Sequence, residues 1–354
     1  MSKKSSIFAV RNVKSDRKVN VTEEIEKVLG AELNKFREAY AAALRSDNPL
    51  LQAIGEHLLS RKGKQLRPML VLLAARLCHG VNEKTISTAV AFELLHTATL
   101  IHDDVVDDSE LRRGVPTIKK RWTNKVAVLA GDYLLSKVIA ITASLRNQKI
   151  FNVVGEIGQT LAKGELLQLH TNGSLQQTDS SRAMWIDEPT YFAVIEQKTA
   201  SLFAACTQAG AVSSGASMRQ ETALRTFGLE LGLIFQMKDD LLDYSDSEEL
   251  GKPTMSDIAD GKVTLPLLIS LQRAPKEDAD EIRTLAEKLA NGEETPSAEQ
   301  TILSFVLRYD GVGYVRQQME LHKRKAVEAL SVFHDSSLKA ALIQLLEYTI
   351  TRVY

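Results

Sequence analysis

Residues 85–113 read TISTAVAFELLHTATLIHDDVVDDSELRR, an apolar stretch that ends in four aspartates and two adjacent arginines. Its apolar residues recur at helical spacing, which predicts a long and mostly buried helix. Neighbouring carboxylates repel one another, and acids at the C-terminal end of a helix oppose its dipole. The aspartates therefore need cationic partners that the helix itself does not supply.

The same helical pattern continues on both sides of this stretch, whereas strand-like alternation is almost absent. The other segments that carry it most clearly are residues 21–45, 67–78, 126–145, 150–170, 190–212, 223–244 and 337–353. Two longer polar loops, residues 171–190 and 244–264, have a length typical of lids or binding loops. We therefore predict an all-α fold with a single domain over residues 21–354, preceded by a mobile N-terminal tail over residues 1–20.

The bulk composition excludes several classes of protein. The 354 residues are 44% hydrophobic and 25% charged, and the formal net charge of -1 is unlike that of a general nucleic-acid binder. The only cysteines are Cys78 and Cys206, so no disulfide framework is expected and the cytoplasm is the expected location. The apolar run near the N-terminus, residues 7–10, is too short for a signal peptide. No unbroken apolar run of roughly 18 residues predicts a membrane span.

Two aspartate clusters share the spacing DDxxD, and each lies at the polar end of an apolar helix. They are Asp103, Asp104 and Asp107, and Asp239, Asp240 and Asp243. Residues four apart lie on one face of a helix, so Asp103 and Asp107 should stack. A solvated helix end would explain one aspartate pair but explains a repeated triplet poorly. Because Mg²⁺ is typically held by one or two carboxylates plus substrate phosphates, the clusters predict two facing walls that bind Mg²⁺ and a phosphate-bearing ligand.

Basic residues at several points along the chain suit a ligand with two separate phosphate groups. They are Lys64, Arg67, Arg112, Arg113, Lys198, Lys252 and Lys262. For most of them an ordinary surface charge is an equally good interpretation. Lys198 differs because its neighbours, such as Leu202 and Phe203, are typical of a buried helix, and a buried lysine needs a partner. A diphosphate with its Mg²⁺ would provide one.

These motifs resemble those of the trans-isoprenyl diphosphate synthases, and within them the long-chain polyprenyl diphosphate synthases. The resemblance covers nearly the whole chain, in the order GKQLRP, HTATLIHDDVVDDSELRRG, KTA, GLIFQMKDDLLD and GKPTMSDIADGKVTLPLL. It implies a helical bundle of the isoprenoid synthase type with a central apolar cavity. It also implies a homodimer and about three Mg²⁺ ions per active site.

The resemblance also assigns roles to individual residues. The six aspartates would bind the metals, and the predicted catalytic residues are Lys198, Thr199 and Gln236. The allylic diphosphate would be contacted by Arg112, Lys198 and Lys252, with Lys262 on the same phosphate side. Isopentenyl diphosphate would be held by Lys64, Arg67, His96 and Arg113. Thr199 and Gln236 would flank the reacting carbons.

This division of roles suits the expected chemistry, a repeated condensation of isopentenyl diphosphate onto an allylic diphosphate. The allylic carbon–oxygen bond must ionise, and metal ions with fixed arginine and lysine donors stabilise the departing diphosphate. The isopentenyl double bond then attacks the allylic cation, and the departing diphosphate is the expected acceptor of the lost proton. A dry apolar pocket protects the cation from water.

Two small residues below the first cluster, Ala98 and Thr99, indicate a long product. In short-chain members of the resembled family, aromatic residues at these positions block the pocket. Ideal helical geometry places Thr99 under Asp103 but turns Ala98 off that face, so the role of Ala98 rests on the resemblance. Close helix packing is the alternative reason for small residues. We predict an all-trans product of about 35 to 45 carbons from farnesyl or geranylgeranyl diphosphate, used for a quinone side chain.

Several alternatives remain open at this point. A short-chain synthase making farnesyl or geranylgeranyl diphosphate would share every motif except the open pocket. A class I terpene cyclase shares the first DDxxD, but its second metal motif usually differs from DDLLD. A non-catalytic partner subunit generally lacks the aspartate clusters. A purely structural helical protein is the last alternative. Lys238 precedes the second cluster directly and would compete for its carboxylates unless it points away.

Overall fold

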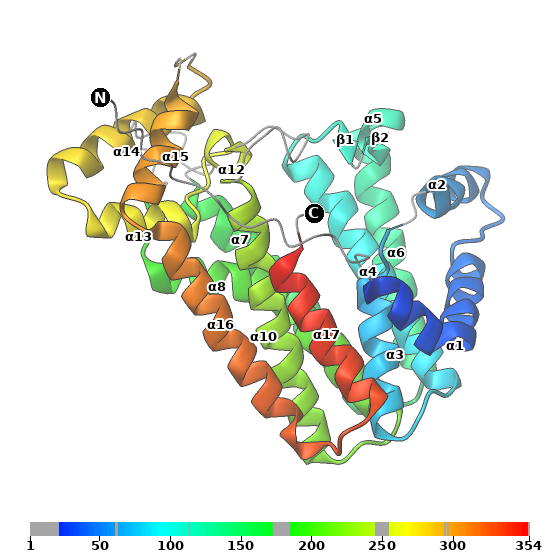
Figure 1. Ribbon diagram of the computed structural model, residues 1–354. Helices are drawn as coiled ribbons and strands as arrows, with labels where there is room; N and C mark the ends of the chain where they lie inside the picture. Colours follow the sequence, from blue (N-terminus) through cyan, green and yellow to red (C-terminus); the bar gives the residue numbers. More distant parts are fainter. Residues whose placement is uncertain are drawn as a thin grey trace, which may run out of the picture.

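The computed structural model describes residues 21–60, 63–112, 114–172, 185–244, 255–293, 295 and 297–352, with only the backbone of residues 21–23. The predicted tail over residues 1–20 lies outside the described residues, as do the predicted ligands Arg113 and Lys252. The described part of the chain is almost wholly helical, which confirms the predicted all-α class (Figure 1).

Each segment that the sequence pattern predicts as helical is helical over most of its length, and the structure adds further helices, chiefly in the last third of the chain. Those of the first half are α1 (Val21–Ala43), α2 (Pro49–Ser60), α3 (Leu66–Cys78), α4 (Glu83–Val106), α5 (Ile118–Arg121), α6 (Asn124–Ser144) and α7 (Gln148–Thr171). Those of the second half are α8 (Glu188–Ile195), the π-helix η1 (Glu196–Ala200), α9 (Ser201–Ser213), α10 (Met218–Leu242), α12 (Ser256–Ala259), α13 (Leu265–Arg273), α14 (Lys276–Ala290), α15 (Ala298–Arg308), α16 (Gly311–Ala329), the 3₁₀-helix η2 (Leu330–Val332) and α17 (Ser337–Thr351). Among the described residues, the only strands are β1 (Leu111–Arg112) and β2 (Val115–Pro116), which form one antiparallel hairpin.

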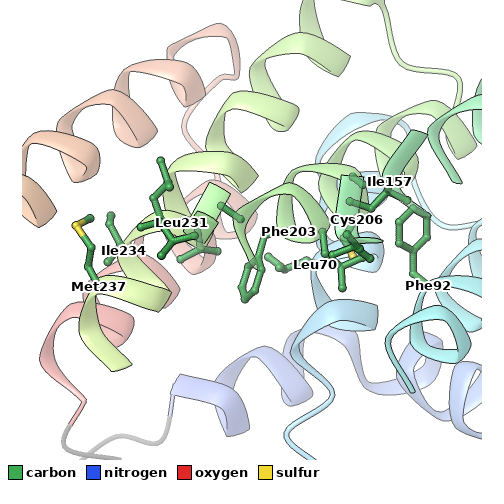
Figure 2. Packing of buried hydrophobic residues seen from close by; sticks show 14 of the residues in the cluster. Leu70, Phe92, Ile157, Phe203, Cys206, Leu231, Ile234 and Met237 are labelled. Atoms are coloured by element: carbon green, nitrogen blue, oxygen red, sulfur yellow. The ribbon is translucent and has the colours of Figure 1, made fainter. Parts of the chain in front are cut away.

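The two helices that carry the aspartate clusters, α4 and α10, both run through the core. Helix α4 packs against α3, α6 and α9, and α10 packs against α9, α16 and α17. Figure 1 shows α10, α16 and α17 as long neighbouring rods. Between these helices lie fully buried side chains such as Leu70 of α3, Phe92 of α4 and Phe203 of α9 (Figure 2). Burial of these apolar faces holds both helices in place.

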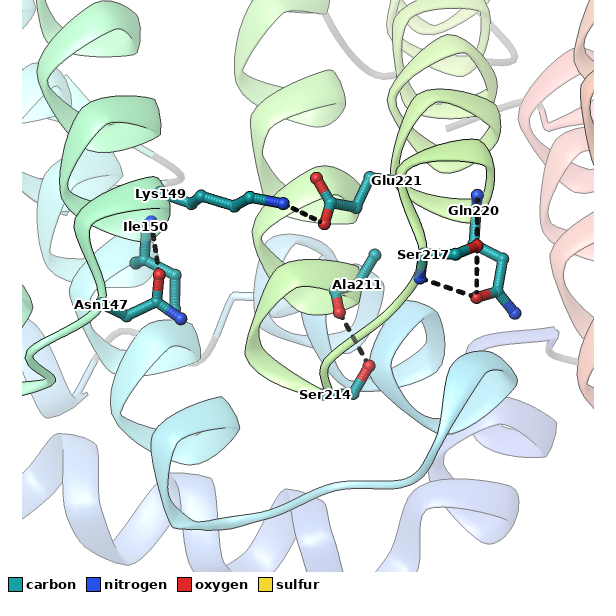
Figure 3. A network of polar contacts seen from close by, with 8 residues as sticks. All are labelled: Asn147, Lys149, Ile150, Ala211, Ser214, Ser217, Gln220 and Glu221. Atoms are coloured by element: carbon teal, nitrogen blue, oxygen red, sulfur yellow. Dashed lines mark hydrogen bonds and ion pairs between the residues drawn. The ribbon is translucent and has the colours of Figure 1, made fainter.

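The start of α10 is fixed by local hydrogen bonds (Figure 3). Ser217 caps the helix in a capping box with Gln220, and the Lys149 ammonium of α7 donates to the buried Glu221 carboxylate at 2.8 Å. A similar capping box between Asn82 and Thr85 starts α4. With a rise of 1.5 Å per residue, these starts lie about 35 Å from the aspartates at the helix ends. The N-terminal ends of α4 and α10 are therefore fixed by capping hydrogen bonds, and their C-terminal ends carry the aspartate clusters.

The segment predicted as one helix over residues 190–212 contains a π-helical turn at Glu196–Ala200. Two glycines make room for it. A Cβ on Gly164 of α7 would lie 2.7 Å from the backbone nitrogen of Lys198, and a Cβ on Gly232 of α10 would lie 2.5 Å from the Cα of Ala200. A π-turn inserts one extra residue into a helix and is frequent at functional sites. Here it carries Lys198 and Thr199, both predicted site residues.

Helix α6 is the one described helix that is long and apolar enough to cross a membrane by length and composition, with 33% of its most apolar window buried. The same test is passed by core helices of proteins that have no membrane span. Exposed apolar side chains on α6 include Val128, Leu129 and Ile139. They show an outward apolar face and do not establish a span.

Candidate active site

The first aspartate cluster lies in the last turn of α4. Asp103 and Asp104 are helical, and Asp107 is the C-cap, whose amide N–H donates to the Asp103 carbonyl at 2.8 Å. Helical geometry therefore continues to Asp107, as the DDxxD spacing predicts for a stacked pair. The neighbouring Asp108 leaves the helix with a φ of 51° and is exposed.

Asp104, the middle aspartate, is buried, with 3% of its surface exposed. Its Oδ1 accepts a hydrogen bond from the Arg112 Nε at 2.7 Å. Arg112 lies on β1, so the hairpin that follows α4 folds back and neutralises this carboxylate. A buried charge requires such a partner. Arg112, predicted as a diphosphate ligand, therefore also anchors the first cluster.

The second cluster repeats this arrangement at the end of α10, where Asp239 and Asp240 are helical and Asp243 is the C-cap. The middle aspartate is again buried, with Asp240 3% exposed. Its Oδ2 accepts from the Tyr191 hydroxyl at 2.5 Å and its Oδ1 accepts from the Gln236 amide at 2.9 Å. The Thr199 hydroxyl donates to the Gln236 Oε1 at 2.9 Å. Three predicted residues thus form one network, together with Tyr191, which sequence reasoning missed.

The two outer aspartates of this cluster are also hydrogen-bonded. Asp243 accepts from the Ser256 hydroxyl at 2.8 Å and from the Asp257 amide at 3.1 Å, which attaches α12 to the end of α10. Burial and repulsion between the nearby carboxylates raise the pKa values of Asp240 and Asp257. This excess of negative charge is a feature of a site that attracts cations.

Asp239 accepts a hydrogen bond from Arg352, whose Nη2 lies 2.7 Å from the Asp239 Oδ1. The Arg352 side chain is 9% exposed, also donates to the Phe235 carbonyl at 3.1 Å, and lies over the Phe235 ring at 4.1 Å. Sequence reasoning missed Arg352, because one arginine after the last helix carries no local signal. Arg352 therefore takes the place considered for Lys238, whose pKa is lowered by burial, Arg352 and Arg316, while Asp239 opposes that shift.

Lys198, a predicted diphosphate ligand, also has a partner within the protein. Its Nζ lies 2.9 Å from a carboxylate oxygen of Glu165 on α7, and its side chain is 26% exposed. The lysine is therefore half-buried, because the π-turn directs it toward α7 and not into the core. Glu165 was also missed by sequence reasoning. The only sequence signal for Glu165 is the presence of a glutamate within the amphipathic helix predicted over residues 150–170.

Lys198 and Lys262 lie near aspartates of the first cluster and also line the cavity beside Asp240 of the second cluster. Burial raises the pKa of Asp103 to about 6, with Glu165 adding to the effect and Lys198 opposing it. Burial works against the charge of Lys262, but Asp260, Asp257 and Asp107 outweigh it and raise the Lys262 pKa. Lys262 is thus coupled to Asp107 of the first cluster and to Asp257, whose amide donates to Asp243 of the second cluster.

A cavity of about 180 Å³ opens beside the second cluster. Five predicted site residues line it: Lys198, Thr199, Gln236, Asp240 and Lys262. Tyr191 and Asp257 complete its polar wall, and Val194, Ile195 and Val263 give it an apolar wall. The cavity therefore combines a charged and polar wall with an apolar wall.

The residues predicted for isopentenyl diphosphate lie in another region. The Lys64 Nζ is 3.4 Å from the Tyr348 hydroxyl of α17, and the Arg67 guanidinium lies over the Phe203 ring at 5.3 Å. The Phe203 and Phe235 ring centroids are 5.2 Å apart. An aromatic layer thus connects this basic region to the residues around Asp239.

Other predicted residues lie on α4. His96 is half-buried, seven residues before Asp103. Ala98 is fully buried in the core, and Thr99 is half-buried with its hydroxyl bonded to the His96 carbonyl at 2.9 Å. Ala98 and Thr99 therefore face different surroundings, as ideal helical geometry indicates.

No group of three or more His, Cys, Asp or Glu side chains in the described part of the chain is already arranged as a metal site. The carboxylates engage protein partners, above all Arg112, Arg352 and Tyr191. A metal would therefore be bound by one or two carboxylates of each wall, with the remaining ligands from phosphate and water.

Comparison with known proteins adds the family. The family model for polyprenyl synthetase matches residues 48–303. The chain is 35% identical over 331 residues to octaprenyl diphosphate synthase of Escherichia coli K12, covering 93% of this chain and 98% of that protein. It is 37% identical over 310 residues to a short chain isoprenyl diphosphate synthase of Methanothermobacter thermautotrophicus, covering 86% and 90%. A crystal structure of polyprenyl synthase from Caulobacter crescentus CB15, complexed with calcium and isoprenyl diphosphate, matches with a TM-score of 0.83 at 32% identity, covering 96% and 100%.

An all-helical bundle with two aspartate clusters at helix ends and a partly apolar cavity, together with these relatives, identifies an isoprenoid-type prenyltransferase. The chain belongs to the polyprenyl synthetase family, which confirms the resemblance seen in the sequence. Membership also excludes the purely structural helical protein.

Proposed function

We propose that this prenyltransferase is a long-chain all-trans-polyprenyl diphosphate synthase. It would extend farnesyl or geranylgeranyl diphosphate with isopentenyl diphosphate to a product of about 35 to 45 carbons. The observation that supports it most is a partly apolar cavity beside Asp240, lined by Lys198 and Lys262, which are also coupled to the first aspartate cluster.

The donor set suits a divalent cation, for which we propose Mg²⁺. Its outer carboxylates, on Asp103, Asp107, Asp239 and Asp243, are hard oxygen ligands of the kind that Mg²⁺ prefers. The raised pKa of Asp103 indicates that its ionised form lacks sufficient positive charge nearby. Calcium in the Caulobacter relative supports dependence on a divalent metal. When bound, the metal would neutralise charge on the departing diphosphate.

The protein's own groups would divide the two substrates between them. Lys198 and Arg112, with Lys252, would contact the allylic diphosphate. Lys64, Arg67 and His96, with Arg113, would hold isopentenyl diphosphate away from the metal walls. This separation is required because only the allylic diphosphate must leave. Fixed cationic donors stabilise that charge without reorganisation.

The network around Asp240 would orient the reacting end of the cavity. Thr199 donates to Gln236, and Gln236 donates to Asp240, so the Thr199 hydroxyl is held at the cavity wall. The Tyr191 hydroxyl keeps its proton, because burial and the adjacent carboxylate raise its pKa well above 10.0. Tyr191 is therefore unsuited to act as a base, and the departing diphosphate is the proposed proton acceptor. The apolar wall excludes water from the cation.

A homodimer is also part of the proposal. The exposed apolar face of α6, with Val128, Leu129 and Ile139, is suited to be covered by a second copy of the chain. Burial of such a face stabilises association by roughly 25 cal/mol per Å² of apolar surface. Sedimentation velocity of the purified protein distinguishes a dimer from a monomer.

The decisive experiment is a chain-length assay. Purified protein is incubated with Mg²⁺, farnesyl diphosphate and labelled isopentenyl diphosphate, and dephosphorylated products are sized. Chelated metal and the variant Asp103→Asn serve as controls and should abolish the ladder. A ladder of products that ends at about eight isoprene units would support the proposal.

The assay also separates the remaining candidates. A stop at about three or four units would retain the enzyme class and favour a short-chain synthase, a product class named for the Methanothermobacter relative. No elongation would contradict the proposal and favour a partner subunit. A cyclic hydrocarbon product would favour the terpene cyclase.

A further inference from the structure

We propose that His57 of α2 is a positioning residue. It holds the segment that carries Lys64 and Arg67, the proposed ligands of isopentenyl diphosphate, against the β1–β2 hairpin. This inference rests on the proposed function, because it concerns the second substrate of that reaction. His57 lies in the last turn of α2, well before the GKQLRP motif, and sequence analysis attached no role to it. Its ring connects two segments that carry predicted diphosphate ligands.

The His57 ring is buried, with 4% of the residue exposed, and makes two directed hydrogen bonds. Its Nε2 lies 3.0 Å from the Pro116 carbonyl of β2, and its Nδ1 lies 2.9 Å from the Arg121 Nη1 of α5. A carbonyl only accepts and a guanidinium only donates. The ring is therefore neutral, with the proton on Nε2, and each nitrogen has a fixed role.

Aromatic contacts hold the ring in that orientation. The Trp122 ring packs edge-on against it, with centroids 5.6 Å apart and planes at 82°. The Arg121 guanidinium lies over the same Trp122 ring at 4.9 Å. Three residues, one from α2 and two at the end of α5, thus form a compact clamp. We use the term clamp for His57, Arg121 and Trp122 together.

The two sides of the clamp belong to the two parts of the proposed site. On one side, α2 ends at Ser60, and the chain reaches Lys64 four residues later and Arg67 in the first turn of α3. On the other side, Pro116 pairs with Leu111 in the hairpin, where Arg112 donates to Asp104 of the first cluster. The clamp therefore fixes the distance between the Lys64–Arg67 segment and the first aspartate wall.

Helix α2 needs such a fixed point because it lies at the periphery of the bundle in Figure 1. Its described buried residues are Ile54, Gly55 and His57. Gly55 holds the middle of the helix close to α1, where an added Cβ would lie 2.5 Å from the Leu44 carbonyl oxygen. His57 holds the end nearest to Lys64. Small displacements of a binding group weaken binding of a charged ligand strongly.

The test is a comparison of the two Michaelis constants in His57→Phe, which keeps an aromatic ring against Trp122 and removes both hydrogen bonds. The KM for isopentenyl diphosphate should rise about tenfold, the change that about 1.4 kcal/mol corresponds to. The KM for farnesyl diphosphate should change less than about twofold, because its site is dominated by the aspartate walls. His79→Gln, at an exposed position after α3, is the matched control and should leave both constants unchanged.

A purely structural role would give a different result. A folding defect lowers the active fraction and therefore the apparent kcat, while both Michaelis constants of the remaining folded enzyme stay at their wild-type values. That outcome would overturn the proposal. If His57→Phe does not fold, Arg121→Met at an exposed residue removes one clamp bond and should raise the same KM. The double variant should be no worse than the poorer single variant, because both act through one contact.

Failure of the inference differs from failure of the proposed function. Wild-type protein without any elongation would contradict the function. Wild-type elongation with an unchanged KM for isopentenyl diphosphate in both variants would contradict only the clamp.

Discussion

Arg352 forms an ion pair with Asp239, a carboxylate that the proposed function assigns to Mg²⁺. We therefore predict that removing this arginine strengthens Mg²⁺ binding. In the structure the Arg352 guanidinium donates to the Asp239 Oδ1 at 2.7 Å. Replacing Arg352 by Gln removes that ion pair. It also removes the hydrogen bond to the Phe235 carbonyl and the stacking on the Phe235 ring.

The magnitude follows from these contacts. Asp239 has a side chain 40% exposed, so solvent screens the pair and its contribution is about 1 kcal/mol. The carbonyl hydrogen bond and the ring contact each add roughly 0.5–1 kcal/mol. The variant without metal should therefore be less stable by about 2 kcal/mol, and its Tm should fall by about 2 to 5 °C.

Metal binding should change in the opposite direction. Because Arg352 competes with the cation for Asp239, its loss should strengthen Mg²⁺ binding by about 1 kcal/mol, or roughly fivefold in half-saturating concentration. The assay is the rise of Tm with added Mg²⁺ in the absence of substrate. Lys323→Gln on α16 removes a surface cation that pairs with Glu347 and is the control. Unchanged or weaker Mg²⁺ binding in Arg352→Gln would refute competition.

Three further predictions follow from single side chains. Asp103 has a pKa raised to about 6, so the native state holds more protons than the unfolded state between about pH 4 and 6. Without metal, the free energy of unfolding should therefore fall by about 2 kcal/mol as the pH rises through that window, and Asp103→Asn should remove this pH dependence in urea titrations. Tyr191→Phe removes a donor from buried Asp240 and should cost about 1–3 kcal/mol of stability and slow elongation. Tyr309→Phe, in a half-buried pair with Asp278 away from the aspartate clusters, should leave the elongation rate unchanged. Ala98→Phe places a large side chain at a fully buried position, so it should lower the free energy of unfolding by about 1–3 kcal/mol and shorten the longest product in the chain-length assay. Full-length product would show that residue 98 does not limit the product length.

Much of the site could be predicted from the sequence because its signals are local. The DDxxD spacing fixes Asp103 and Asp107 on one helical face, and the same reasoning applies to the second cluster. The apolar pattern before each cluster predicts a buried helix, and α4 and α10 both run through the core. Helical periodicity and short motifs depend on residues three or four apart, which any single sequence displays.

The partners of those residues could not be predicted in the same way. Tyr191 binds an aspartate 49 residues away, Lys198 binds a glutamate 33 residues away, and Arg352 binds an aspartate 113 residues away. Their own sequence neighbourhoods contain nothing that identifies a partner. The ion pair of Lys198 with Glu165 could not be predicted either, because it depends on how the π-turn packs against α7.

The all-α class and the spacing of the two aspartate clusters could be established from the sequence alone. Those properties follow from helical periodicity and from the chemistry of side chains at fixed spacing. Only the tertiary structure decided which carboxylate is buried, which is neutralised by arginine or tyrosine, and that His57 connects α2 to the hairpin. Such choices depend on packing between distant segments, because burial and hydrogen-bond geometry exist only once the helices have assembled.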